Sequence, residues 1–173
     1  MPRLKSIPSD AVPAALEKAL RYRLLNEPLE AESICRDVLL VQPDSQEALI
    51  TLLLALTDLF DDEYVSALER AKAILPQIEG PYEQAYYEGI VYERWAKAET
   101  GRHVPRHVLE GWYLHAMRCF ERAEALAEPD NPDAILRYNA CARQMERPLE
   151  HGAAEPSLAH DIESEFADEM PLR

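Results

Sequence analysis

The sequence predicts an all-α protein, and three observations lead to that prediction. Apolar residues recur every three or four positions through most of residues 12–147, which is the spacing of one face of an α-helix. Proline and glycine interrupt this pattern at intervals, as they do where helices end. The third observation is a skeleton of small residues that occurs twice in similar form: Ala31-x3-Cys35-x2-Val38-x4-Pro43, and Ala116-x3-Phe120-x2-Ala123 followed by Pro129. Small residues at fixed helical offsets let two helices pack closely, so this skeleton favours helical hairpins.

The first four predicted helices span about residues 13–25, 29–41, 46–59 and 63–75. Pro13 suits the first turn of a helix, where the N–H that proline lacks has no partner. The Asn-Glu-Pro stretch at 26–28 ends this helix, and 42–45 ends the second while offering a cap to the third. The third is apolar nearly all round, so we expect it to be buried on several sides.

Three further helices are predicted at about residues 82–99, 105–127 and 133–146. The fifth begins after Gly80 and Pro81 and ends at a Thr-Gly pair. The Pro-Asp-Asn-Pro stretch at 129–132 ends the sixth, and its last proline takes the first position of the seventh. About seven helices are therefore expected.

We expect three regions along the chain: a short arm at 1–11, a folded helical domain at 12–147, and an acidic tail at 148–173. Residues 149–173 hold seven acidic residues and one basic residue, which is typical of a disordered segment. Ile162, Phe166 and Met170 recur every four residues and would share one face of a short helix on binding. Whether the tail regulates the domain or only keeps it soluble stays open at this point.

Composition excludes several classes of function. The net charge of −14 argues against binding nucleic acid, which requires clustered lysine and arginine, and against docking on anionic membranes. The sequence has no apolar run of the roughly 18 residues that a membrane span needs and no signal-peptide pattern. Three cysteines without CxxC spacing indicate reduced packing residues. We therefore expect a cytoplasmic protein.

Neither catalysis nor a bound cofactor is predicted. The sequence has no glycine-rich phosphate loop and no nucleophile elbow. His103 with His107, and His115 with Cys119, have the spacing that places two metal ligands on one helix face, but no companion motif accompanies either pair. We expect no metal site, no cofactor and no enzymatic activity.

The repeated skeleton resembles that of the tetratricopeptide repeat family. Unit one (12–45) matches the family's signature spacings through the residues Ala19, Tyr22, Ala31, Cys35, Val38 and Pro43. The second and third units match at fewer positions, and about 15 additional residues lengthen the third. The resemblance implies a right-handed α-solenoid of about three helical hairpins with a C-terminal capping helix. It also implies close helix contacts, which we expect at Ala31, Gly89 and Ala116.

In that family the first helices of the hairpins line a concave groove that binds protein segments. Carried over by register, the groove positions here are Leu16, Leu20, Arg23, Ile50, Leu54, Thr57, Tyr86, Ile90, Glu93, Arg94 and, at the capping helix, Arg137 and Cys141. This mostly apolar lining suits an amphipathic helix or an extended peptide. Leu16 and Leu20 stand where one subtype of the family carries a carboxylate clamp, which argues against that clamp. We expect a scaffold that binds a partner protein; the alternative is a chaperone-like holder of a secreted or assembling client.

Overall fold

The computed structural model describes residues 3–61, 64–100, 102 and 104–147, with only the backbone described at 64 and 65. The described residues form seven α-helices, two short 3-10 helices and no strand, so the all-α prediction is confirmed. The α-helices are α1 (Val12–Leu24), α2 (Pro28–Val41), α3 (Gln46–Asp58), α4 (Tyr64–Ile74), α5 (Pro81–Glu99), α6 (Arg106–Glu124) and α7 (Asp133–Glu146). The 3-10 helices are η1 (Ser9–Ala11) and η2 (Leu75–Gln77). The predicted acidic tail lies outside the described residues.

The helix boundaries follow from local chemistry. The Ser45 hydroxyl accepts a hydrogen bond from the backbone N–H of Ala48 and caps α3. Proline stands in the first turn of α1, α2 and α5, where its missing N–H removes no helical hydrogen bond. Gly80 precedes α5 with a φ of 87°, which glycine adopts without the steric cost that a side chain brings. The sixth helix ends at Glu124, slightly earlier than predicted.

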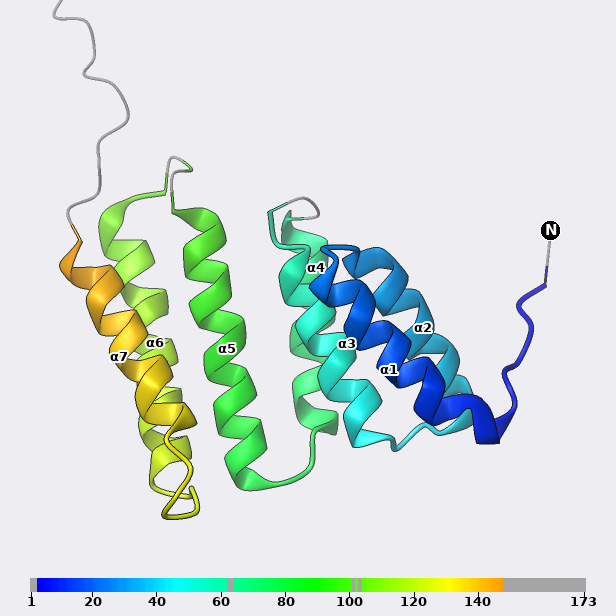
Figure 1. Ribbon diagram of the computed structural model, residues 1–173. Helices are drawn as coiled ribbons and strands as arrows, with labels where there is room; N and C mark the ends of the chain where they lie inside the picture. Colours follow the sequence, from blue (N-terminus) through cyan, green and yellow to red (C-terminus); the bar gives the residue numbers. More distant parts are fainter. Residues whose placement is uncertain (1–2, 62–63, 101, 103, 148–173) are drawn as a thin grey trace, which may run out of the picture.

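The helices follow one another in space in the order of the chain, from α1 and α2 on the right of Figure 1 to α7 on the left. Each helix packs against the next one along the chain, and α3 also contacts α1 and α5. The helices therefore pack in chain order from α1 to α7. No helix in the described residues is both long and apolar enough to cross a membrane.

Helix α5 divides the larger part of the core into two clusters. Val91 and Trp95 join a cluster built mainly from α3 and α4, with contributions from α1 and α2. Ile90 and Ala96, on the other side of α5, join a cluster built from α6 and α7. A smaller third cluster joins the start of α1 to α2 and α3. Buried α5 thus links the two ends of the helix array, which explains why this helix shows no single apolar face.

Helices α5 and α6 pack closely at Gly89. A Cβ atom placed on Gly89 would lie 2.5 Å from Cε1 of Phe120, closer than two such carbons can approach. Ala31 and Ala116 are fully buried, as is Phe120. All three positions at which the sequence predicts a close contact are therefore interior, because glycine or alanine there leaves room for the neighbouring helix.

Replacing Gly89 with alanine is expected to lower the free energy of unfolding by about 1–3 kcal/mol, because the new methyl group forces α6 away from α5. Gly111, which also lies within a helix, is the matched control, since nothing lies within 4 Å of a Cβ placed there. Gly111→Ala should raise stability by about 0.5–1 kcal/mol through its helix propensity. Urea unfolding of both variants measures the difference. Equal effects of the two changes would contradict this account of the contact.

Candidate functional site

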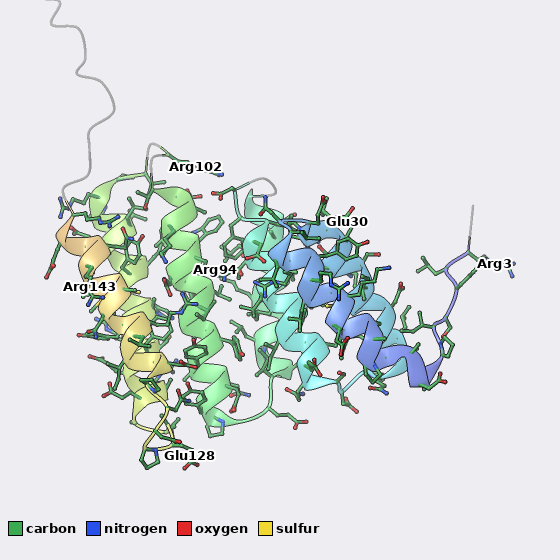
Figure 2. All side chains as sticks on the ribbon, viewed as in Figure 1. Arg3, Glu30, Arg94, Arg102, Glu128 and Arg143 are labelled. Atoms are coloured by element: carbon green, nitrogen blue, oxygen red, sulfur yellow. The ribbon has the colours of Figure 1, made fainter. Side chains whose placement is uncertain are left out.

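The C-terminal parts of α1, α3 and α5 surround a pocket of about 420 Å³. The side chain of Arg94 extends between α5 and α3 (Figure 2) and forms part of its wall. The pocket is lined by Arg23, Leu24, Asn26, Thr57, Asp58, Phe60, Asp61, Arg94, Lys97 and Ala98. These residues come from segments far apart in the sequence, so the pocket exists only because the three helices pack together.

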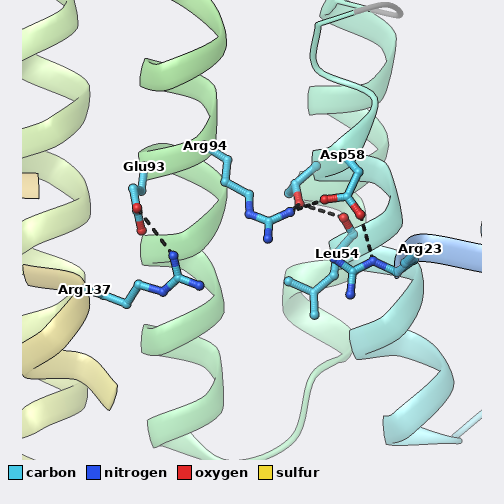
Figure 3. Close-up of polar contacts among 7 residues, drawn as sticks. Arg23, Leu54, Asp58, Glu93, Arg94 and Arg137 are labelled. Carbon is cyan, nitrogen blue, oxygen red and sulfur yellow. Dashed lines mark hydrogen bonds and ion pairs between the residues drawn. The ribbon is translucent and has the colours of Figure 1, made fainter. Parts of the chain in front are cut away.

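One carboxylate, that of Asp58, holds the three helices together at the pocket. Nε of Arg23 on α1 donates to Oδ2 of Asp58 at 2.8 Å, and Nη1 of Arg94 on α5 donates to Oδ1 (Figure 3). Nη1 of Arg94 also donates to the hydroxyl of Thr57 at 2.8 Å, and that hydroxyl donates to the carbonyl of Leu54 at 2.7 Å. Two arginines from different helices therefore share one acid.

The sharing leaves both arginines with more donors than acceptors. Among the described residues, the side chain of Arg23 has one hydrogen-bonding partner, Asp58, and that of Arg94 has two, Thr57 and Asp58. Each guanidinium group carries five N–H donors, so one carboxylate and one hydroxyl cannot satisfy both groups. The Arg23 and Arg94 side chains are only 16% and 26% exposed, which limits how far bulk water can replace the missing acceptors.

A second ion cluster lies beside the pocket, between α5 and α7. Glu93 is fully buried, its Oε1 is paired with Lys97 one turn along α5, and Nη1 of Arg137 on α7 lies 3.5 Å away (Figure 3). Burial by itself would lower the pKa of Arg137, but the Glu93 carboxylate and a hydrogen bond with Tyr86 raise it above its usual value. Arg137 is therefore charged, and it offsets part of the cost of burying Glu93.

The structure divides the predicted groove residues into two groups. Four are buried: Leu16, Thr57, Ile90 and Glu93. Leu16, Ile90 and Glu93 pack against neighbouring helices, which corrects the expectation that they face a partner, whereas Thr57 lines the pocket. The others are partly accessible and remain candidate contacts: Leu20, Arg23, Ile50, Leu54, Tyr86, Arg94 and Arg137. Cys141, proposed at the capping helix, is also fully buried.

Sequence reasoning brought Arg23, Thr57 and Arg94 to one surface but missed the acid that connects them. Asp58 follows Ile50 and Leu54 at intervals of four residues, so the helical register that selected those two also selects Asp58. Lys97 was missed as well, although it lies one turn beyond Glu93. Extending the helical register by one turn on α3 and on α5 would have included both Asp58 and Lys97.

Glu88, His115 and Cys119 form the one group of candidate metal ligands in the part of the chain that the structure describes. Nε2 of His115 lies 3.1 Å from Glu88, and Nη2 of Arg122 donates to both Glu88 and the Cys119 sulfur. Burial raises the pKa of the Cys119 thiol to about 11, whereas a metal ligand must be a thiolate. Arg122 thus occupies the place of a cation, and we interpret the group as an ion-pair cluster. Of the other predicted pair, His103 lies outside the described residues.

Comparison with known proteins gives no significant match to any family model, curated protein or solved structure. The resemblance to tetratricopeptide repeats consequently rests on the sequence spacings.

Asp58→Asn is expected to lower the free energy of unfolding by about 1–3 kcal/mol, because both arginines lose the charged acceptor that holds them between helices. Asp130→Asn is the control, because it removes the same charge from an exposed turn. Any change in stability that comes only from lowering the negative charge of an acidic protein appears in both variants. Urea unfolding of both variants at low and high salt provides the measurement. If the free energy of unfolding falls no further in Asp58→Asn than in the control, Asp58 does not stabilise the contacts between these helices.

The three cysteines should resist thiol reagents in the folded protein. Burial raises the pKa of Cys35 and Cys141 to about 12 each and that of Cys119 to about 11, so at pH 8 almost no reactive thiolate is present. Titration with a chromogenic disulfide reagent at pH 8 should detect no rapidly reacting thiol, and three after unfolding in urea. A rapidly reacting thiol in the folded protein would show that at least one site opens readily.

Proposed function

We propose that this protein is a helical-repeat module of the tetratricopeptide type that binds a segment of a partner protein. In this proposal the pairs α1–α2, α3–α4 and α5–α6 are the three repeats of a right-handed solenoid, and α7 is the capping helix. Support comes from the chain-order packing and from the small interior residues Ala31, Gly89 and Ala116. A helical pair cannot bury its apolar face alone, so stacked neighbours complete each repeat.

The observation that carries the proposal is the pocket at which the first helices of all three pairs meet. Arginine donors at its wall, beside the exposed Leu24, offer both charged and apolar contacts. Arginine residues in partly enclosed pockets are typical of the residues that dominate protein interfaces. A segment lying along α1, α3 and α5 would reach the pocket as well as the partly accessible Leu20 and Leu54.

We propose binding rather than catalysis. The charged groups of the pocket neutralise one another in part, and all three thiols of the described domain have a raised pKa. A catalytic nucleophile needs the opposite shift. The same buried, reduced cysteines support the proposal of a cytoplasmic protein.

One observation favours the second candidate, a chaperone-like holder of client proteins. Leu24, Leu25 and Leu29 are all more than half exposed around the turn between α1 and α2, next to the pocket. An exposed apolar patch beside the binding face suits an unfolded or unassembled client.

A photo-crosslinking amino acid at Leu20 tests the binding face, and the same group at Leu40 on α2 is the control. Leu20 precedes Arg23 by one helical turn, whereas Leu40 is 66% exposed on a helix that contributes nothing to the pocket. In the source cells the Leu20 position is expected to give one discrete adduct that the Leu40 position does not give. Many adducts from Leu20 would favour the client-holding role. Identical adducts from both positions, or none from Leu20, would contradict both.

A further inference from the structure

We propose that the pocket between α1, α3 and α5 is a carboxylate-binding site, and that the acidic segment 161–169 of the same chain occupies it when no partner is bound. The inference does not depend on the proposed function, because it concerns a contact within one chain. If a partner also binds this face, the segment competes with it.

The pocket wall carries three cationic side chains, Arg23, Arg94 and Lys97, and two carboxylates, Asp58 and the exposed Asp61. Arg23 and Arg94 share the single carboxylate of Asp58, so the trio keeps one net positive charge. Lys97 is paired with Glu93, and the positive charge that this second trio keeps is that of Arg137, which lies beside Glu93 and outside the pocket lining. Charge-assisted hydrogen bonds from guanidinium to carboxylate are about twice as strong as neutral ones and are often bidentate. A second carboxylate at Arg23 and Arg94 would supply the acceptors that Asp58 lacks.

The pocket arginines differ from the exposed arginines of the domain in burial and in fixed contacts. Arg118 on α6 and Arg143 on α7 are exposed, and Arg143 projects away from the helices (Figure 2). Exposed cations in water contribute little to an ion pair, because solvent screens them. The pocket arginines are already fixed by Asp58 and are mostly shielded, so less conformational entropy is lost when an acid binds there.

The size and rim of the pocket fit an acidic segment that also carries apolar residues. About 420 Å³ is within the range of small ligand sites and is sufficient for a carboxylate side chain with its neighbours. Leu24 and Ala98 form accessible apolar parts of the wall, and Phe60 lies buried behind it. Residues 161–169 read Asp-Ile-Glu-Ser-Glu-Phe-Ala-Asp-Glu, with five acids and with Ile162 and Phe166 between them. The acids of the segment therefore complement the pocket arginines, and its apolar side chains complement the apolar part of the wall.

The last described helix, α7, ends on the same side of the domain as the pocket. Nη2 of Arg106 at the start of α6 donates to the carbonyl of Met145 near the end of α7, at 3.4 Å. Nη2 of Arg102, between α5 and α6, donates to the carbonyl of Asp61 at the pocket, at 2.6 Å. The ends of α3, α5 and α7 therefore lie on the same side of the domain, as Figure 1 shows at the top.

The connecting chain is long enough. Residues 148–160 can span up to roughly 43 Å at about 3.3 Å per residue, while packed helices lie about 8–10 Å apart. The pocket is separated from α7 by α5 alone, since Glu93 and Arg137 connect these two helices. A tethered segment at this range has an effective concentration on the order of millimolar, so even a weak carboxylate contact is well populated.

Paramagnetic relaxation in the full chain tests the inference. A nitroxide on Ser164→Cys places the probe within the acidic segment, and the three native thiols are protected by burial and by a raised pKa. The amide signals of Asn26, Asp61 and Ala98 at the pocket should show the largest relaxation enhancement. The enhancement should fall several-fold between about 0.1 M and about 1 M salt, as the charges are screened.

Matched variants identify the site. Arg23→Gln with Arg94→Gln should abolish the enhancement at the pocket amides, whereas Arg118→Gln with Arg143→Gln, which removes the same charge, should leave it unchanged. Neutralising the segment with Asp161→Asn, Glu163→Gln and Glu165→Gln should also abolish it without altering the domain. This last variant decides the question if the pocket variant fails to fold.

Four results would overturn the inference. The first is equal enhancement in the two arginine variants, and the second is an unchanged enhancement in the variant with the neutralised segment. The third is an enhancement centred on Arg143 and Arg147, and the fourth is an enhancement on isotope-labelled protein mixed with a separately spin-labelled copy. The third result would place the segment on the exposed arginines at the end of α7. The fourth would assign the contact to a second molecule.

Discussion

The burial of α5 on two opposite sides is the constraint on which the rest of the structure depends. One side completes the cluster of α3 and α4 through Val91 and Trp95, and the other completes the cluster of α6 and α7 through Ile90 and Ala96. Such a helix has little free surface for polar groups, yet α5 carries Glu93 in its middle. Lys97 and Arg137 lie beside Oε1 of Glu93, so this charge has cationic neighbours in a low-dielectric interior.

Several ion pairs among the described residues connect different helices. Asp58 connects α1, α3 and α5, and Glu32 on α2 connects to Arg70 on α4 at 2.6 Å. Apolar packing by itself is non-directional and tolerates small sliding of one helix against another. Some of these carboxylates are partly buried and need donors from two particular helices. Such a carboxylate does not tolerate sliding, because a shift of one turn leaves a charge without a partner. These acids therefore help to set the register between helices.

The same arrangement produces the candidate binding site. Tying two arginines to one aspartate fixes their side chains and leaves part of their hydrogen-bonding capacity unused. A chain of net charge −14 would in general repel acidic segments, whereas the pocket brings two arginines and a lysine together. A fold of stacked helices does not by itself imply a function. The functional argument here rests on this pocket and its charges.

The sequence by itself determined the number, order and approximate bounds of the helices. Periodicity and turn chemistry are local properties, and Pro28, Ser45 and Pro81 act on their immediate neighbours. The resemblance of the sequence to tetratricopeptide repeats also singled out Gly89 as a close helix contact. Only the tertiary structure shows that the contact is with Phe120.

The site was determined by tertiary structure to a greater degree. Helical register placed Leu16 and Ile90 on the same faces as Leu20 and Arg94, but burial depends on which helix covers each position, and that information is not local. The pairing of Asp58 with two arginines likewise depends on how far α1, α3 and α5 lie from one another. Sequence spacing specifies directions around a single helix axis, whereas distances between axes follow from the packing of all the side chains in between.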